Sequence, residues 1–359
     1  EGTGINPMRG QNNIQGAGDA GAIPVNYPGF QPVTDPVNQE KFKQLYGRKI
    51  DLEKGITKVT ALNECGKSIH AMIIDGENTV VSDPDRTHCL HALESLEHLV
   101  VIDIFRTETA ELADVVLPAT AWGETDGVCV NTERRVQRLR QAVPPHGDAK
   151  PDWWIVSEIA RRLDIPGFEY DSAEDIFNEL CALSPIYAGL DWDRIENAEY
   201  LWPVPEKDHP GTPVLHEGEF KNGRGLFSLI NYRDPAEVVD EDYPVWLTTG
   251  RRLEAYHTRT QTGRSAGIEY LLHEESLEVH PENLAEWQLT DGGFAHLTSR
   301  RGTVKIRVRA TDQSPPGTVF CSFSFNDVPV NILTGSGYDP VTETAELKVC
   351  AVRVEPAET

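Results

Sequence analysis

The chain has 359 residues, enough for two or three domains at roughly 150 residues each. It carries 33 basic and 57 acidic side chains, a formal net charge of −24 that is spread along the whole length. Such a surface excludes the basic face that nucleic acids require and disfavours adhesion to anionic membranes.

The first unusual stretch is a loop over residues 6–21 that gathers glycines and amide side chains around one guanidinium, Arg9. Glycine lets the backbone approach a polar ligand, and the amides supply donors and acceptors. Arg9 would hold an anion, since its planar fork suits a carboxylate. A flexible surface loop is the alternative, because Gly and Asn also favour turns. Since the sequence starts at Glu1 in this loop, without Met, we expect a piece of a longer or split polypeptide.

The next segment has the rhythm of a βαβ unit. Apolar runs at residues 69–74 and 99–102 flank a helical stretch at 85–96, which predicts parallel strands joined by a helix. A short helix at 108–113 and a strand end at 115–117 begin a further repeat. Ligands of open parallel sheets bind beyond the carboxyl ends of the strands, so the loops at 75–78 and 103–107 are candidate cofactor loops.

The second half changes character. Residues 153–163 and 173–183 are spaced as amphipathic helices, which we expect to pack on the sheet. A long connection rich in Pro, Gly and charge, over 191–242, marks a domain boundary. Beyond it an all-β barrel is predicted, with strands at 245–249, 294–299, 303–310 and 318–323 and a hairpin turn at 300–302. The expected fold class is α/β followed by all-β, with domains at 1–190 and 243–359.

Eight motifs occur in the same order as in one known family. They are GxNPxRGQNNxQGA, YPGFQPVTDP, GEN with SDPD, DIFRTETAELADVVLPA, NTERRVQ, KPDWWIVSEIA, LTTGR and KVCAVRVEP. The set resembles the molybdopterin oxidoreductases, and specifically the α subunits of formate dehydrogenases, from Gly2 to Pro356. The resemblance implies a Rossmann-like α/β region with a parallel sheet and a C-terminal double-psi β-barrel.

The resemblance also implies a reaction. Members of the family oxidise formate to carbon dioxide at molybdenum or tungsten, held by two molybdopterin guanine dinucleotides. Arg9 matches the family arginine that orients formate and stabilises its charge, and Gln11 matches a glutamine of the same pocket. The cysteine or selenocysteine metal ligand, its histidine and the 4Fe-4S ligands belong to the family's N-terminal half, which this sequence does not contain. The chain by itself is therefore not expected to be catalytic.

Cofactor contacts are implied by the matching loops. The residues that match the family's dinucleotide-binding positions come from the strand ends, the TxGR turn of the barrel and the C-terminal segment: Gly76, Glu77, Asn78, Ser82, Asp83, Asp103, Thr107, Thr249, Gly250, Arg251, His257, Thr258, Asn331 and Lys348. Among them, Asp83 could also be the N-cap of a helix.

Four positions depart from the family pattern. Gly18 and Ala20 stand where relatives often have Cys and Met, Thr79 follows GEN where Pro is usual, and Ala255 stands where His is frequent. These changes put the packing around the pterins in doubt, while the arginine loop keeps its pattern.

The six cysteines stand singly, without a CxxC pair, which favours reduced, mostly buried thiols of a cytoplasmic protein. No signal peptide or membrane-spanning run occurs in the sequence. The acidic excess with little Lys also suggests a halophilic source. Expected partners are formate, the N-terminal half of the same subunit and an electron-transfer subunit.

Two other functions stay open. Another molybdopterin oxidoreductase, such as an assimilatory nitrate reductase, would share the cofactor but not the substrate, and the RGQNN loop is the feature that separates the two. A non-catalytic scaffold chain from a split gene, active only with a partner chain, is the second alternative.

Overall fold

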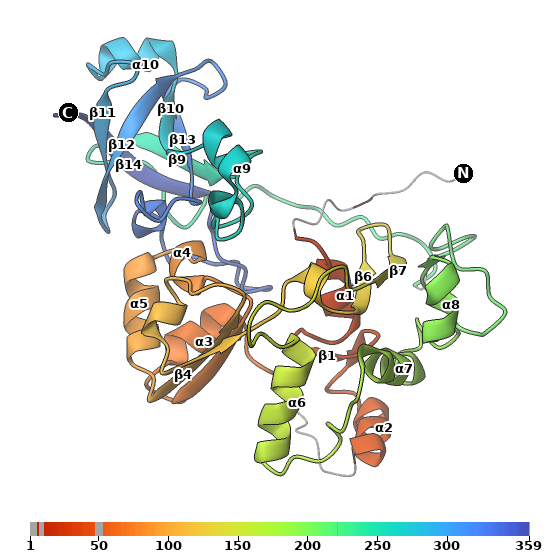
Figure 1. Cartoon of the computed structure of the whole chain (residues 1–359). Coiled ribbons are helices and arrows are strands. Elements are labelled where there is room, and N and C mark those ends of the chain that lie inside the picture. The colour runs from red at the N-terminus through yellow and green to blue at the C-terminus, as the bar shows by residue number, and fades with distance from the viewer. Residues whose placement is uncertain (1–5, 7–10, 47–52, 221, 359) are drawn as a thin grey trace. The chain divides into compact units, whose positions relative to one another are not determined.

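A computed structural model describes residues 6, 11–46, 53–220 and 222–358 (Figure 1). Its contacts form two compact units: unit 1 comprises Glu1–Ile56 and Pro118–Leu229, and unit 2 comprises Thr57–Leu117 and Ile230–Thr359. The predicted domains at 1–190 and 243–359, joined by a connection at 191–242, remain a prediction. The compact units group residues 57–117 with the C-terminal part of the chain instead.

Unit 2 begins with the predicted parallel sheet. β3 (Ala71–Asp75) pairs in parallel with β4 (His98–Asp103), and β5 (Val115–Pro118) is the third strand. Strands of a parallel sheet carry near-continuous apolar runs because helices cover them. The helices of this part of the chain are α3 (Lys58–Glu64), α4 (Thr79–Ser82) and α5 (Arg86–Glu94). Residues of α3 and α5 share an apolar core with the strands.

The helix predicted at 108–113 is only a 3-10 turn, η1 (Ala110–Leu112). Asp114 ends it, because its backbone N–H donates to the Leu99 carbonyl at 2.9 Å and its carboxylate accepts from the Leu99 N–H at 2.7 Å. These two bonds start the pairing with β4 before another helical turn can form.

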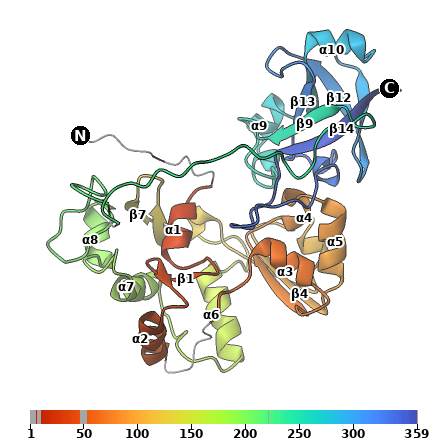
Figure 2. The same ribbon diagram turned by 180° about the vertical axis from the view of Figure 1, so that it is seen from behind.

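The rest of unit 2 is a closed six-stranded barrel, in the order β10-β12-β11-β14-β9-β13 (Figure 2). β9–β13 and β10–β12 pair in parallel, and the other neighbours pair antiparallel. Alternate side chains fill the interior, as the period of a strand requires. The strands are β9 (Val245–Gly250), β10 (Ser276–Val279), β11 (Phe294–Thr298), β12 (Thr303–Ala310), β13 (Thr318–Ser322) and β14 (Val349–Ala357).

The α/β region and the closed barrel confirm the predicted fold class. The prediction missed β10 and β14, and the C-terminal part is not purely β. It also contains two helices, α9 (Ala266–Leu271) and α10 (Pro281–Glu286), and two 3-10 turns, η3 (Thr262–Arg264) and η4 (Val330–Ile332).

Unit 1 is built around an antiparallel sheet of β6 (Gly127–Val130), β7 (Arg135–Leu139) and β8 (Tyr200–Leu201). Phe177 and Cys181 of α7 (Ala173–Leu183) pack in one core with Val130 and Val136 of this sheet. The prediction that this helix packs on the parallel sheet is therefore wrong. The apolar spacing identified the helix, but the sequence did not reveal the second sheet that receives it.

Unit 1 further contains α8 (Trp192–Asn197), which with β8 occupies the beginning of the predicted connection. That connection is consequently shorter than expected. The remaining elements of the unit are α1 (Ile14–Asp19), β1 (Asn26–Tyr27), β2 (Gln31–Pro32), α2 (Pro36–Tyr46), η2 (Trp122–Glu124) and α6 (Asp152–Arg162). Across the part of the chain that the structure describes, no helix combines the length and apolar character needed to cross a bilayer.

Candidate functional site

The loop after β3 carries a charged cluster. The Lys58 Nζ atom, on the first turn of α3, lies 2.5 Å from Oδ1 of Asp83 and 2.7 Å from Oε1 of Glu77. Ser82 donates its hydroxyl to the same Glu77 oxygen at 3.2 Å. Gly76 opens the loop at φ +65°, and no atom lies within 4 Å of where a Cβ would stand. The four predicted residues Gly76, Glu77, Ser82 and Asp83 thus lie together beside open space.

Asp83 is an ion-pair partner and not a helix N-cap. The cap of α5 is Asp85, whose carboxylate accepts from the His88 N–H. Burial raises the pKa of Asp83, and Lys58 opposes this rise. Burial also disfavours the charge of Lys58, but Asp83 and Glu77 outweigh burial and raise its pKa. Lys58 therefore stays charged and neutralises part of an acidic loop.

The other predicted residues of this sheet edge are bonded internally. The Asn78 amide donates to Glu108 at 2.6 Å and accepts from the Thr109 hydroxyl at 3.0 Å. The Thr107 hydroxyl accepts from the Ala110 N–H at 3.2 Å, and Asp103 accepts from the Phe105 N–H at 3.2 Å. These hydrogen bonds hold the loop after β4 in shape.

The end of β9 supplies the barrel side of the site. Thr249 donates its hydroxyl to the Leu347 carbonyl, and its N–H donates to the Lys348 carbonyl at 3.4 Å. A Cβ on Gly250 would stand 2.5 Å from Cε2 of Phe320, so only glycine fits there without a shift. These contacts fix the strand end from which the loop at 251–259 departs.

Two nitrogen-bearing side chains lie against the Phe323 ring, and Arg251 acts electrostatically on a third, Lys348. The Arg251 Cζ atom lies 5.6 Å and the His257 ring centroid 5.4 Å from the centroid of the Phe323 ring. Burial, and then the charge of Arg251, lower the pKa of both His257 and Lys348. Neither Arg251 nor Lys348 forms an ion pair with any carboxylate that the structure describes.

Arg251 and Lys348 are the charged members of this group, and we call them, together with His257, the cationic cluster. Glu77 raises and Lys58 lowers the pKa of His257, so the two loops act on one region of unit 2. Like charges that crowd together without a carboxylate partner repel one another, and an anion between them removes that repulsion. In a chain of net charge −24 such a cluster is an exception. The arrangement can hold a ligand with phosphate or carboxylate groups.

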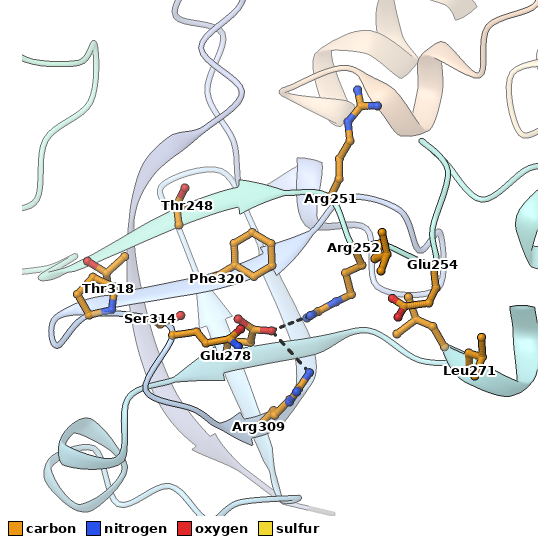
Figure 3. A pocket seen from close by; sticks show the side chains of 14 residues that line it. Thr248, Arg251, Arg252, Glu254, Leu271, Glu278, Arg309, Ser314, Thr318 and Phe320 are labelled. Atoms are coloured by element: carbon orange, nitrogen blue, oxygen red, sulfur yellow. Dashed lines mark hydrogen bonds and ion pairs between the residues drawn. The ribbon is translucent and has the colours of Figure 1, made fainter. Parts of the chain in front are cut away.

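The next residue, Arg252, was not predicted. Its guanidinium is buried and binds Glu275 at 2.9 Å and Glu278 at 2.7 Å, and Glu278 lies 3.7 Å from Arg309 (Figure 3). Glu275 is itself fully buried and accepts a hydrogen bond from Ser322. Two successive arginines at a strand end were the only sequence signal for this network.

Asn331 lies in unit 2 but not as an open cofactor contact. Its buried amide donates to the Val81 carbonyl at 2.8 Å, and the Thr334 hydroxyl donates to its carbonyl oxygens at 3.2 Å. Thr334 also accepts from the Asp85 N–H at 3.4 Å. Asn331 therefore ties the barrel to α4 within unit 2.

Two cavities adjoin these residues. One, of about 420 Å³, is lined by Thr107 and Thr258 and by the buried Ser324, whose hydroxyl has no hydrogen-bond partner among the described residues. The other, of about 520 Å³, lies on the barrel and is lined by Arg251, Arg252 and Phe320 among others (Figure 3). The first is the better candidate for a polar ligand, since a buried hydroxyl without a partner is costly.

Of the two predicted substrate residues, only Gln11 falls within the described part of unit 1. Arg9 lies outside the described residues, and Gln11 lies shortly before α1. Further along the same loop, Asn13 accepts from the Val130 N–H at 2.9 Å. The buried Asp19 accepts from Gln15 at 2.7 Å and from the Tyr187 hydroxyl at 2.6 Å. Part of the amide-rich loop is therefore structural.

Within the described ranges no group of three His, Cys, Asp or Glu side chains could hold a metal ion. All six cysteines are free, and five of them are buried. Burial raises the pKa of Cys89 to about 12 and that of Cys181 to about 12, which keeps both thiols protonated and unreactive at neutral pH.

Two protein-family models match the chain. The model described as molybdopterin oxidoreductase matches residues 2–162, and the one described as molybdopterin dinucleotide binding domain matches residues 245–351. The second match covers β9 to the start of β14, and hence Thr249 to Lys348 of the candidate site.

Curated proteins of similar sequence agree with the two family models. The alpha subunit of the F420-dependent formate dehydrogenase of Methanocaldococcus jannaschii is 43% identical over 99% of this chain and 53% of its own length. Formate dehydrogenase H of Escherichia coli is 34% identical over 98% of this chain and 50% of its own length. The chain thus spans about half the length of these relatives.

A solved structure shares the fold. Acetylene hydratase from Pelobacter acetylenicus matches 89% of this chain and 50% of that chain with a TM-score of 0.67, at 18% sequence identity. At this identity the likeness concerns the fold alone.

Proposed function

Since the chain belongs to the molybdopterin oxidoreductase family, we propose that it forms part of the catalytic alpha subunit of a molybdenum- or tungsten-dependent formate dehydrogenase. The single observation that supports this most is the match to formate dehydrogenase alpha subunits along 99% of the chain at up to 43% identity. The proposed reaction converts formate to carbon dioxide, a proton and two electrons. A 4Fe-4S cluster and the metal's protein ligand would come from the part that corresponds to the other half of the relatives.

The residues present fit a pterin guanine dinucleotide. Its diphosphate is an anion, and the cationic cluster of Arg251, His257 and Lys348 has no carboxylate partner among the described side chains. Its guanosine is rich in donors and acceptors, and the cavity beside Thr107 and Thr258 holds the unpartnered hydroxyl of Ser324. Gly76 leaves open space at the loop after β3, where a side chain would obstruct a ligand.

In this proposal the chain's residues have separate roles. Arg251 and Lys348 hold the diphosphate, while Glu77 and Ser82 offer hydrogen-bonding groups at the sheet edge. Arg9 would hold the carboxylate of formate through two parallel hydrogen bonds, with Gln11 beside it. When bound, the molybdenum or tungsten pterin group supplies the two-electron redox chemistry. Asn78, Asp103, Thr107, Thr249 and Asn331 act chiefly by holding the loops in place, because their side chains have internal partners.

The substrate role of Arg9 can be tested in the complete protein. Arg9→Ala should lower formate-dependent dye reduction about a thousandfold, the size of effect expected when a preorganised charge contact is removed. Molybdenum or tungsten and pterin per chain should stay unchanged. Arg162→Ala, which removes an exposed partner of Glu158, is the matched control. Retained turnover in Arg9→Ala would contradict the role.

The cofactor role of the barrel has its own test. Arg251→Ala and Lys348→Ala in the complete protein should each reduce the pterin and metal content of the purified protein several-fold. Lys305→Ala is the control, since Lys305 lies over Phe294 on the barrel, outside the cationic cluster. Unchanged content in both cluster variants would remove these residues from the proposed cofactor site.

The two alternative functions give different results in the same assays. An assimilatory nitrate reductase would consume nitrate with a reduced dye and ignore formate. A scaffold chain would show neither activity, alone or with its partner. Formate turnover by the complete protein separates the proposal from both.

We also propose a cytoplasmic location with an electron-transfer subunit as partner, and a high-salt source. The excess of 24 acidic charges supports the last point, because salt screens the repulsion between them. Loss of secondary structure on dialysis from molar to millimolar KCl is the expected result. A melting temperature that does not depend on salt would contradict it.

A further inference from the structure

Two neighbouring arginines at the end of β9 point in opposite directions. In Figure 3 the Arg251 side chain extends away from the barrel wall, whereas Arg252 turns toward Glu278. Arg251 is exposed, and the contact that the structure describes for its guanidinium is with the Phe323 ring. The direction of Arg251 is therefore set mainly by its backbone, and so by whatever fixes the residue beside it.

Arg252 is fixed firmly. Its Nε and Nη2 atoms donate to Oε1 of Glu275 at 3.0 and 2.9 Å, and Nη1 donates to Oε1 of Glu278 at 2.7 Å. Nη2 also donates to the Ser276 carbonyl at 2.7 Å and to its hydroxyl at 3.1 Å. The guanidinium lies 5.5 Å from the Phe320 ring, the same ring that leaves room only for glycine at position 250.

Stability alone does not explain this network. The free-energy cost of desolvating buried charges is about as large as their mutual attraction, and well-packed apolar side chains often stabilise a fold equally well or better. A planar guanidinium with three fixed carboxylate contacts does, however, have a fixed orientation, because its N–H groups can form all of these hydrogen bonds in one geometry only.

We infer that Arg252 is a positioning residue: held by Glu275 and Glu278, it fixes the turn after β9 so that Arg251 extends toward Lys348 and the anion that this cluster binds. The identity of that anion as a cofactor diphosphate rests on the proposed function. The positioning of Arg251 does not, because it can be measured without any ligand.

The ligand-free measurement uses Lys348 as a reporter. The charge of Arg251, after burial, lowers the pKa of Lys348. Moving Arg251 away should therefore raise the pKa of Lys348. This pKa can be followed by NMR titration of protein labelled with ¹³C-lysine, and the Lys348 signal is assigned by its loss in Lys348→Arg. Arg251→Ala gives the size of the effect.

Arg252→Met alone leaves Glu275 buried without its partner, so the informative variant is Arg252→Met with Glu275→Gln, in which Glu278 keeps Arg309 at 3.7 Å. We expect this double variant to raise the pKa of Lys348 as much as Arg251→Ala does, and addition of Arg251→Ala to raise it no further. Arg307→Met, which removes the partner of Glu274, is the control and should change nothing.

The second readout is binding of GDP-mannose, a guanine diphosphate diester, to the whole chain. Arg251→Ala and the double variant should each weaken binding about tenfold and should not add. If the Lys348 pKa keeps its wild-type value in the double variant, or the two changes add fully, Arg252 is only structural and the inference is wrong. If the Lys348 pKa responds as expected while no variant alters GDP-mannose binding, the positioning stands and the proposed cofactor role of the cluster fails.

Discussion

Lys58 places its ammonium 2.5 Å from the carboxylate of Asp83, and this pair joins the first turn of α3 to the end of α4. Glu77 shares the same ammonium at 2.7 Å. The loop that follows β3 is thereby held by one cation between two acids, at the edge of the sheet where the proposed ligand would lie.

Replacing Lys58 should cost stability. Lys58→Met leaves the buried Asp83 carboxylate without its partner, and we expect the free energy of unfolding to fall by about 1–2 kcal/mol, since the lysine is partly exposed. Lys58→Met combined with Asp83→Asn should recover most of the loss in urea unfolding. The folded-state pKa of Lys58 is raised above its ordinary 10.5, so its contribution is full below that pH and is lost as the pH rises through the raised value. A double variant as unstable as the single one would contradict this account.

His257 should make anion binding depend on pH. Burial and Arg251 lower its pKa from the ordinary 6.5, so it is neutral at pH 7 and an anion must help it to take up a proton. GDP-mannose, whose charge is constant in this range, should bind about two- to fivefold more tightly at pH 5.5 than at pH 7.5. His257→Gln should remove that dependence, and a pH profile unchanged by the substitution would exclude His257 from the site.

The same histidine affects stability with the opposite sign. The unfolded chain binds the proton more readily than the folded chain, so the contribution of His257 is favourable above about pH 6.5 and is lost as the pH falls through that value. The urea midpoint of the wild type should therefore fall relative to that of His257→Gln as the pH is lowered from 7.5 to 5.5.

Replacing either of two glycines of the site by alanine should destabilise the protein, for a different reason in each case. In Gly250→Ala the new methyl would meet the Phe320 ring at 2.5 Å, and we expect a loss of about 1–3 kcal/mol that Phe320→Leu partly restores. Gly76→Ala meets no atom but needs a left-handed backbone at φ +65°, which costs about 1–2 kcal/mol that no neighbouring substitution restores. Chemical unfolding of Gly250→Ala and Gly76→Ala, each with and without Phe320→Leu, separates the two causes, and equal rescue in both would contradict them.

Removing the Asn331 amide should loosen α4. Asn331→Ala leaves the Val81 carbonyl without its donor, at an expected cost of about 1–3 kcal/mol. Hydrogen exchange at the amides of α4 should accelerate more than exchange in β12, because the hydrogen bonds that the structure describes for Asn331 reach Val81 and Thr334 and not β12. Uniform acceleration in both elements would show only a general loss of stability.

Much of the fold could be predicted because helices and strands follow from patterns among residues close together in the sequence. β12 matches its predicted residues 303–310, and α7 matches 173–183, since alternation and helical spacing act over neighbouring residues. β10 was missed because it is only four residues long, Ser276–Val279, and it follows directly on the buried charge of Glu275. The sheet that receives α7 was missed because its strands lie far from it along the chain.

The site was predicted less completely. Glycines and cations could be assigned from the motifs, but the partners of buried polar groups are distant in sequence. Asn331 bonds to a carbonyl 250 residues away, and Arg252 to Glu275 across 23 residues. Neither spacing is periodic, so no local pattern distinguishes a side chain that faces a ligand from one that binds its own backbone.

The strand order of the barrel governs when unit 2 can be completed. β14 lies between β11 and β9, yet it is the last of the six strands along the chain. During synthesis from the N-terminus, β9 and β11 must wait with unpaired backbone groups until residue 357 has left the ribosome. A newly made chain would need shielding of those two edges by chaperones, and a messenger truncated within the final strand would yield a protein prone to pair with other copies.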